Sequence, residues 1–272
     1  MHLIPKVVVF DLDETLGYFV ELSILWDTIQ LYLKDKLLGQ KDFNAILDLY
    51  PEFIKPHIYS ILNYLKYKKR TKDCNSVMIY TNNQGSKEWT ILIKNYFESK
   101  IHFTLFDQII KAFKINGKRI EMGRTSNEKT FDDLVKCTKL PKNTQICFLD
   151  DVFYPNMTGH NIYYIKVNPY IYNLSYDEMI VRFEKSDIGI TLVNGSDNFS
   201  KFARENMQLY DFKYVPKSKD EYEIDKIVSK KIMMHLQIFF DKDWYKPPSG
   251  TRKNRQYVKR KTLKSRGSFY PM

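Results

Sequence analysis

Short apolar runs recur along the first two thirds of the chain, beginning at Lys6. Each run has the length and the nearly continuous apolar character of a strand that is buried on both faces of a parallel sheet. The four runs are KVVVF at 6–10, SVMIYT at 76–81, QICFLD at 145–150 and IYYIKV at 162–167. They predict a parallel sheet in the core of the protein.

Between these runs, apolar residues recur at steps of three and four, which is typical of amphipathic helices. The helical patterns cover about 20–38, 54–69, the segment from Trp89 to Phe97, and about 128–138. Strands that alternate with helices predict an α/β fold with a doubly wound parallel sheet. We expect this main domain to cover residues 1–186.

Three stretches depart from the alternation. Residues 17–53 lengthen the first connection beyond what one crossover helix needs, which predicts a small helical insertion. Between 101 and 127, FDQIIKAF and INGKRIEMG predict a strand and a hairpin. Residues 187–245 are expected to form a helical C-terminal extension. Within it, Ser218 and Glu221 have capping-box spacing ahead of an amphipathic helix at about 219–240, which we expect to pack on the body rather than bind a partner.

Positive charge is concentrated at the C-terminus. The net charge is +11, and the segment from Lys246 to the end holds nine Lys or Arg residues and no acid. Because Pro247, Pro248 and Gly250 break regular structure there, we expect residues 246–272 to form a basic, disordered tail. Such a tail could contact nucleic acid through counterion release, carry a signal for an import receptor, or only aid solubility.

Composition and cysteine usage indicate a folded intracellular protein. Hydrophobic residues make up 43% of the 272 residues, which suits a chain with a sizeable core. Cys74, Cys137 and Cys147 lack metal-ligand or CxxC spacing, so we interpret them as reduced thiols.

No apolar window is long enough for a membrane span, and the first apolar stretch is too short for a signal peptide. We therefore expect no membrane partner and a cytoplasmic or nuclear location. Richness in Lys, Asn, Ile and Tyr is also typical of AT-rich genomes, viral ones among them.

Polar side chains follow three of the predicted strands, at the point where each strand ends. They are Asp11 and Asp13 after the first, Thr81 and Asn82 after the second, and Asp150 and Asp151 at the end of the third. Ligands of open parallel sheets bind beyond the carboxyl ends of the strands, so neighbouring strands would bring these groups to one site. Four gathered carboxylates repel one another unless a cation neutralises them, and all-oxygen ligands favour Mg²⁺. Asp11 could then act as a nucleophile while Asp13 reaches a leaving-group oxygen.

Four short motifs resemble, in order, those of the haloacid dehalogenase (HAD) superfamily of phosphohydrolases. They are DLDETLG at 11–17, YTNN at 80–83, a later Lys, and FLDD at 148–151. The resemblance covers about residues 5–170, and Asp-Leu-Asp-Glu-Thr-Leu is similar to the branch of RNA polymerase II C-terminal-domain phosphatases and NLI-interacting-factor-like proteins. It implies a HAD-like Rossmannoid fold and a Mg²⁺-dependent phosphatase that acts through an aspartyl-phosphate.

The resemblance implies a role for each acid. Asp11 would attack phosphorus. Asp13 would protonate the leaving oxygen and later take a proton from water. Asp150 would hold Mg²⁺ together with Asp11 and the backbone carbonyl of Asp13. Asp151 would support the metal shell or orient the lysine.

The resemblance also implies that a threonine and a lysine bind the transferred phosphoryl group. Thr81 fills the first role, with Asn82 beside it. Asn82, Asn83 and Gln84 could contact the substrate, although these residue types are more typical of a turn. Lys129 is the expected lysine because NEKTFDDL places it at a helix start ahead of the FLDD strand. Three other basic residues stay open: Lys114, Lys118 and, as an assisting group, Arg124.

The substrate is defined less sharply. An insertion as small as 17–53 does not form a large cap, which favours a macromolecular phosphate, and the resemblance favours phosphoserine or phosphothreonine on a protein. TNNQG is also similar to the second motif of polynucleotide 3′-phosphatases, from which the extra Asn83 departs. A small phosphomonoester is a further alternative. The chain could instead be a non-catalytic, structural or assembly component with this fold, although no catalytic position is missing.

Overall fold

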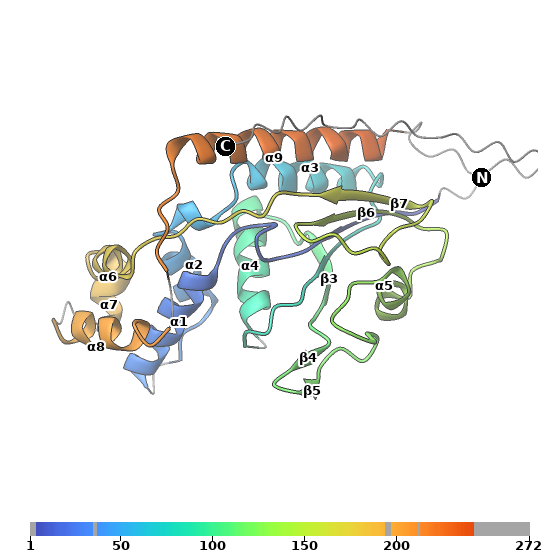
Figure 1. Ribbon diagram of the computed structural model, residues 1–272. Coiled ribbons are helices and arrows are strands. Elements are labelled where there is room, and N and C mark those ends of the chain that lie inside the picture. The colour runs from blue at the N-terminus through green and yellow to red at the C-terminus, as the bar shows by residue number, and fades with distance from the viewer. Residues whose placement is uncertain (1–3, 35–36, 87, 194–196, 211–212, 242–272) are drawn as a thin grey trace, which may run out of the picture.

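The computed structural model describes residues 4–34, 37–86, 88–193, 197–210 and 213–241. Its centre is a five-stranded sheet in the order β3-β2-β1-β6-β7, in which every neighbouring pair is parallel (Figure 1). The strands are β1 Lys6–Phe10, β2 Ser76–Tyr80, β3 Phe106–Ile110, β6 Gln145–Asp150 and β7 Ile162–Lys166. The four strands expected from the apolar runs and the α/β class are therefore confirmed. Strand β3 lies in the stretch where FDQIIKAF predicts a strand.

Strand β1 can occupy the centre of the sheet because both of its faces are apolar. Val7 and Val9 pack into one apolar cluster, and Val8 and Phe10 pack into another, as expected of residues that alternate across a strand. All four are buried. A parallel sheet covered on both faces exposes only its ends to polar groups, and Asp11 stands at one of them.

Helices cover the two faces of the sheet. The first five are α1 Val20–Leu33, α2 Gln40–Leu47, α3 Ile58–Arg70, α4 Trp89–Ile101 and α5 Phe131–Thr138, with a short 3₁₀ helix at Pro51–Phe53. The pattern over 20–38 overestimates the first helix, because the backbone of Lys34 turns to φ 49°. The pattern over 54–69 starts too early, because Pro56 and a left-handed His57 (φ 61°) precede α3.

The helices expected at 17–53 are present and are built into the main core. Leu22 of α1 and Phe43 of α2 are fully buried in the same apolar cluster as Val8 of β1. The hydroxyl of Tyr50 donates a 2.7 Å hydrogen bond to the carbonyl of Met179. The insertion after β1 is thus fixed to later parts of the chain at its far end.

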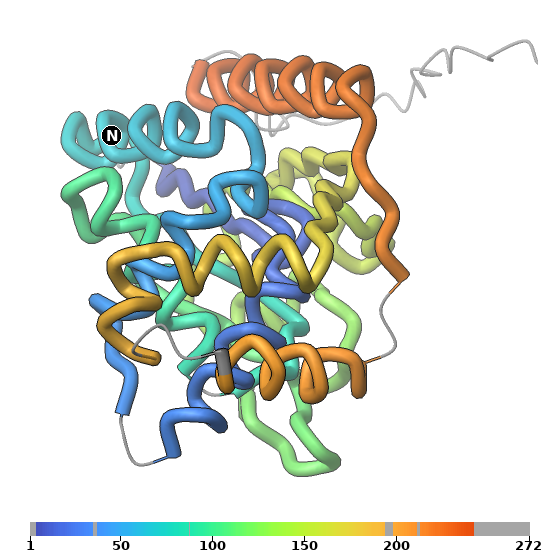
Figure 2. The backbone as a smooth tube through the Cα atoms, turned by 90° about the vertical axis from the view of Figure 1, so that its left-hand side faces the viewer, coloured from blue at the N-terminus to red at the C-terminus, as the bar shows by residue number. Residues whose placement is uncertain are grey.

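Among the described residues after β7 there are four helices, namely α6 Tyr176–Glu184, α7 Asp187–Val193, α8 Asp197–Met207 and α9 Lys219–Phe240. Helix α8 packs against α1 and α6 (Figure 2). Helix α9 has the predicted capping box, in which Ser218 and Glu221 each accept from the other's backbone N–H. Its buried residues, including Leu236 and Phe239, join the main core beside α3 and β7, so the prediction that α9 packs on the body is confirmed (Figure 1).

The predicted hairpin is also present, as the antiparallel pair β4 Lys114–Ile115 and β5 Lys118–Arg119. The basic tail expected at 246–272 lies outside the described residues. Within the described part of the chain, no helix combines the length and the apolar character needed to cross a membrane.

Candidate active site

The carboxyl ends of β1, β2 and β6 meet at one edge of the sheet because these strands are parallel neighbours. The loops that follow them line a pocket of about 310 Å³. All seven residues that the sequence predicts for catalysis, phosphate binding and metal binding line this pocket. The structure adds four more: Glu14, Asn83, Val152 and Tyr154.

Lys129 forms the central ion pairs of the pocket. Its Nζ lies 2.6 Å from Oδ1 of Asp11 and 2.7 Å from Oδ2 of Asp150, and its side chain is buried. Burial disfavours the ammonium, but the two carboxylates outweigh this effect and raise the pKa of Lys129. The next residue, Thr130, caps α5 by accepting from the backbone N–H of Asp133, which fixes the chain beside Lys129.

The other basic residues left open by the sequence do not line the pocket. Lys114 and Lys118 are exposed on the hairpin of β4 and β5. Arg124 is fully buried behind the loop that follows β2, where its Nη1 donates to the carbonyls of Thr81 and Lys111 at 3.1 and 2.9 Å. Arg124 therefore supports the loop that carries Thr81.

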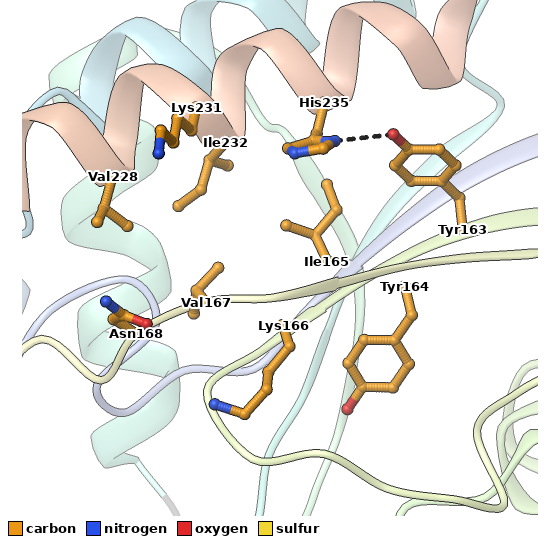
Figure 3. A pocket seen from close by; sticks show the side chains of 10 residues that line it. All are labelled: Tyr163, Tyr164, Ile165, Lys166, Val167, Asn168, Val228, Lys231, Ile232 and His235. Atoms are coloured by element: carbon orange, nitrogen blue, oxygen red, sulfur yellow. Dashed lines mark hydrogen bonds between the residues drawn. The ribbon is translucent and has the colours of Figure 1, made fainter. Parts of the chain in front are cut away.

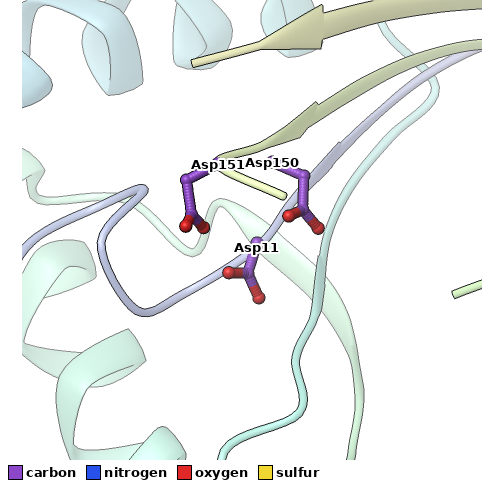
Figure 4. A group of neighbouring side chains, drawn as sticks. All are labelled: Asp11, Asp150 and Asp151. Carbon is purple, nitrogen blue, oxygen red and sulfur yellow. The ribbon is translucent and has the colours of Figure 1, made fainter. Parts of the chain in front are cut away.

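Three carboxylates face one another at the strand ends (Figure 4). Asp11, Asp150 and Asp151 each offer an oxygen within 4.8 Å of the others. Burial raises the pKa of Asp150 to about 6, with Lys129 opposing the shift and Asp11 adding to it, and burial also raises the pKa of Asp11. One ammonium does not balance three acids. Since all the donors are oxygens, these residues fit a hard divalent cation such as Mg²⁺.

Asp151 lies apart from the lysine. Its Oδ1 accepts a 3.4 Å hydrogen bond from the hydroxyl of Thr15, whereas Lys129 bonds Asp11 and Asp150. Of the two roles that the sequence leaves open for Asp151, the geometry favours a place in the metal shell over orienting the lysine.

Asp13 is held beside Asp11 by a residue from another loop. The side-chain amide of Asn83 donates to Oδ2 of Asp13 at 2.9 Å. Burial raises the pKa of Asp13 to about 6, although the hydrogen bond from Asn83 lowers it, and the charge of Asp11 adds to the rise. A carboxyl group with such a pKa can give a proton and take one back near neutral pH.

The turn after β1 needs a glycine where it closes. Glu14 has a left-handed backbone (φ 59°), and its N–H donates to the carbonyl of Gly17 at 2.7 Å. A Cβ on Gly17 would lie 2.5 Å from the carbonyl oxygen of Phe53. The buried Lys55 stabilises the same turn, because its ammonium donates to the carbonyls of Glu14 and Asn168 at 3.5 and 3.2 Å.

The loop after β2 is held in shape by its own side chains. The buried hydroxyl of Thr81 accepts from the backbone N–H of Asn83 at 2.9 Å, which leaves its proton available to a ligand. Asn82 donates to the hydroxyl of Tyr154 at 3.2 Å and accepts from Arg124 at 2.7 Å. Thr81 is therefore the better placed of the two to bind a phosphoryl oxygen, and Asn82 mainly joins the loops together.

The four further residues that line the pocket stand next to those that the sequence predicts for catalysis and binding. Glu14 belongs to the DLDETLG motif, and Val152 and Tyr154 follow FLDD directly. Asn83, for which the sequence leaves open a contact with substrate or a place in a turn, donates to the acid Asp13. The ring of Tyr154 lies 5.5 Å from Nζ of Lys129. Position just beyond a strand end is the signal that could have found them.

A second cavity, of about 380 Å³, lies between β7 and α9 (Figure 3). Its described lining includes Lys166, Lys231 and His235 but no carboxylate. Nδ1 of His235 and the hydroxyl of Tyr163 are 2.8 Å apart, so both groups already have a partner. This cavity therefore lacks the acids that the predicted chemistry needs.

Loops that are distant in the sequence thus bring five carboxylates, two hydroxyls and one ammonium into the pocket at the ends of β1, β2 and β6, and this pocket is the candidate active site. No family model matches the chain, and no similar protein was found among curated proteins or solved structures. The geometry of the pocket is therefore the basis on which a function can be proposed.

Proposed function

We propose that the chain is a Mg²⁺-dependent phosphomonoester hydrolase in which Asp11 forms an aspartyl-phosphate. The observation that carries this proposal is the buried bridge from Lys129 to Asp11 and Asp150, at 2.6 and 2.7 Å. A phosphoryl group in transfer carries negative charge, so its site needs cations beside the nucleophile. Lys129 supplies one cation, and the carboxylates around it are suited to bind a second, Mg²⁺.

In the first step, a carboxylate oxygen of Asp11 attacks phosphorus, and the bond from phosphorus to the leaving oxygen breaks. Asp13 gives its proton to that oxygen, so the leaving group departs as an alcohol. Lys129 and the hydroxyl of Thr81 stabilise the charge on the phosphoryl oxygens. The hydrogen bond from Asn83 keeps the Asp13 carboxyl beside the leaving oxygen.

In the second step, water attacks the phosphorus of the aspartyl-phosphate. Asp13, now a carboxylate, accepts a proton from that water. The bond between phosphorus and the Asp11 oxygen breaks, which restores the Asp11 carboxylate and releases inorganic phosphate. The pKa of about 6 that burial gives Asp13 suits both of its roles.

Asp11, Asp150 and Asp151, with the backbone carbonyl of Asp13, would hold Mg²⁺. When bound, the ion would neutralise phosphoryl charge and help to orient the group for in-line attack. The protein contributes by fixing the acids in place. The backbone N–H of Val152 donates to Oδ1 of Asp150 at 2.8 Å, which orients that carboxylate.

The substrate we propose is phosphoserine or phosphothreonine in a protein. The insertion after β1 is packed into the core, with Leu22 and Phe43 fully buried, so it does not resemble a separate cap over a small substrate. Val152, which lines the pocket, and Phe153 next to it are 48% and 51% exposed. Exposed apolar side chains beside a pocket suit contact with a polypeptide.

A polynucleotide 3′-phosphatase would use the same chemistry on a strand that carries further backbone phosphates. A non-catalytic role gives no reason to bury Lys129 against two carboxylates, because the desolvation of such a group offsets much of the attraction. The presence of a nucleophile, an acid, a hydroxyl and an ammonium in one pocket supports an enzymatic role over a non-catalytic one.

The proposal is tested by trapping the intermediate. The protein is mixed with a phosphoserine peptide and Mg²⁺, quenched in acid and digested, and the peptide that contains Asp11 is analysed by mass spectrometry. We expect the mass of one phosphoryl group on Asp11, removed by hydroxylamine and absent from Asp11→Asn. With p-nitrophenyl phosphate, whose leaving group needs no proton, Asp13→Asn should accumulate more of it, because this variant lacks the base for the second step. Turnover with no phosphorylated Asp11 in either protein would contradict the mechanism.

A further inference from the structure

A smaller cavity adjoins the candidate active site. It has a volume of about 270 Å³ and shares Asp13, Glu14 and Asn83 with the pocket at the ends of β1, β2 and β6, which we call the acid pocket. Its remaining lining residues are Trp89, at the start of α4, and four residues at or just before the start of α1, namely Tyr18, Phe19, Val20 and Ser23. We call this cavity, lined by these residues, the side cleft.

The side cleft has fixed aromatic walls. Phe19 and Trp89 are nearly buried, and each packs edge-on against another ring, Phe97 at 6.5 Å and Phe43 at 5.5 Å between centroids. Val20, in contrast, is 48% exposed. The exposed apolar side chain of the cleft is therefore Val20, and the two aromatic rings beside it are fixed, with little side-chain freedom to lose when a ligand enters.

The position of the side cleft fits the leaving-group side of the substrate. Asp13 must lie against the leaving oxygen to protonate it, and Asp13 lines both cavities. Asp11, Lys129 and Asp150, which would handle the phosphoryl group, line only the acid pocket. The part of the substrate attached to the leaving oxygen would therefore extend past Asp13 toward the side cleft.

The charges around the side cleft disfavour a nucleic-acid strand. Asp13 and Glu14 line it, and none of its described lining residues is Lys, Arg or His. A 3′-phosphorylated strand would place further backbone phosphates near these acids without a counter-charge. A peptide backbone carries no such charges, and an apolar side chain of the peptide would gain free energy by leaving water for Val20 and the rings beside it.

We propose that the side cleft binds a large aliphatic or aromatic side chain that neighbours the phosphorylated residue of a polypeptide substrate. This inference rests on the proposed phosphatase function and narrows its substrate. Specificity then comes from one apolar side chain beside the phosphoserine, held by the lining residues at the start of α1 and by Trp89.

Two variants of α1 form a matched pair for the test. Val20→Lys places a charged side chain in the lining of the side cleft, whereas Leu31→Lys makes the same change at a residue that is 57% exposed and outside the lining. The value of kcat/KM is measured with Mg²⁺ on three substrates. They are a phosphoserine peptide with Phe next to the phosphoserine, the same peptide with Gly in that position, and a 3′-phosphorylated oligonucleotide.

We expect the wild-type protein to prefer the Phe peptide over the Gly peptide by about tenfold or more, the usual effect of filling an apolar pocket. Val20→Lys should lose most of this preference, through a higher KM for the Phe peptide. Leu31→Lys should keep it. Because the added cation would attract backbone phosphates, Val20→Lys should turn over the oligonucleotide better only if the cleft holds a nucleic acid.

Other outcomes distinguish a failure of the side-cleft inference from a failure of the proposed phosphatase function. Equal wild-type rates on the two peptides, or equal losses on both in Val20→Lys, would overturn the inference and leave the phosphatase proposal standing. A wild-type preference for the oligonucleotide, strengthened in Val20→Lys, would assign the cleft to nucleic acid instead. No Mg²⁺-dependent hydrolysis of any of the three substrates would contradict the proposed function and the cleft with it.

Discussion

The ammonium of Lys129 lies 2.6 Å from Oδ1 of Asp11, and the same nitrogen lies 2.7 Å from Asp150. Lys129, two residues ahead of α5, thereby joins the end of β1 to the end of β6. The contact engages the oxygen of the proposed nucleophile directly. A buried charge network of this kind leaves the remaining charges unpaired when one member is removed. Lys129 should therefore matter for both activity and stability.

Lys129→Met removes the cation while keeping a long side chain. We expect kcat/KM for a phosphopeptide to fall by about 10²–10³-fold, since the transferring phosphoryl group loses a stabilising charge. We also expect the free energy of unfolding without Mg²⁺ to fall by roughly 3 kcal/mol, since Asp11 and Asp150 stay buried and unpaired. Urea unfolding and steady-state kinetics measure the two effects. Lys114→Met, on the exposed hairpin, is the control, and a Lys129→Met protein that matches it in both assays would refute the proposed role.

Asp13→Asn should distinguish leaving groups. Serine needs a proton to leave, whereas p-nitrophenolate is a weak base and leaves without one. In the first turnover, followed by rapid quench, we expect the rate with a phosphoserine peptide to fall by about 10²–10⁴-fold, and the p-nitrophenolate burst to fall far less. Equal losses with the two substrates would show that Asp13 is not the acid.

Glu21 should make the stability of the protein depend on pH. It is fully buried in α1 and accepts from the side-chain amide of Asn173 at 2.7 Å. Burial raises its pKa from 4.5 to about 7, so the folded protein holds this proton more tightly than the unfolded chain does. The contribution of Glu21 to the free energy of unfolding should therefore decline as pH rises from about 4.5 to about 7, by up to about 3 kcal/mol.

Glu21→Gln should remove this decline, because the amide resembles the protonated acid and does not titrate. Urea unfolding of both proteins at pH 5 and pH 8 measures the difference. We expect the free energy of unfolding of Glu21→Gln, measured relative to that of the wild type, to be higher at pH 8 than at pH 5. Glu205→Gln, at an exposed position of α8, is the control. The same pH dependence in the wild type and in Glu21→Gln would show that Glu21 is ionised in the folded protein.

Gly17→Ala should disrupt the turn that positions Asp13 and Glu14. The new Cβ would lie 2.5 Å from the carbonyl oxygen of Phe53, so the backbone must move, at a cost of about 1–3 kcal/mol. We expect a lower thermal midpoint and a lower kcat, since the acid is displaced. Gly39→Ala, where the nearest atom is 3.9 Å away, provides the comparison and should leave kcat unchanged. Wild-type kcat in Gly17→Ala would show that the turn tolerates the added methyl group.

The sheet and the meeting of the acids could be predicted because both follow from local patterns. The run 6–10 is apolar on both faces, and Asp11 stands directly after it. Parallel pairing then brings the strand ends to one edge of the sheet. Lys129 carries no such local signal, and its place beside Asp11 was expected only from the resemblance of the motifs to the phosphohydrolases.

The contacts that shape the pocket could not be predicted, because they join loops that are far apart in the chain. Asn83 bonds Asp13 across 70 residues, and Arg124 reaches the side chain of Asn82 across 42. A buried arginine has no signature in the hydrophobic pattern. The apolar pattern also misplaces the end of α1 and the start of α3. Lys34 and His57 adopt positive φ there, which their residue types do not predict.

The proposed role of Asp11 is tested most directly by the hydrolysis of p-nitrophenyl phosphate. Wild-type protein and Asp11→Asn are each assayed with Mg²⁺ and with EDTA. We expect hydrolysis by the wild type with Mg²⁺, its loss in EDTA, and no hydrolysis by Asp11→Asn under either condition. Hydrolysis that survives in Asp11→Asn would show that another residue is the nucleophile, and hydrolysis that survives in EDTA would contradict the metal dependence.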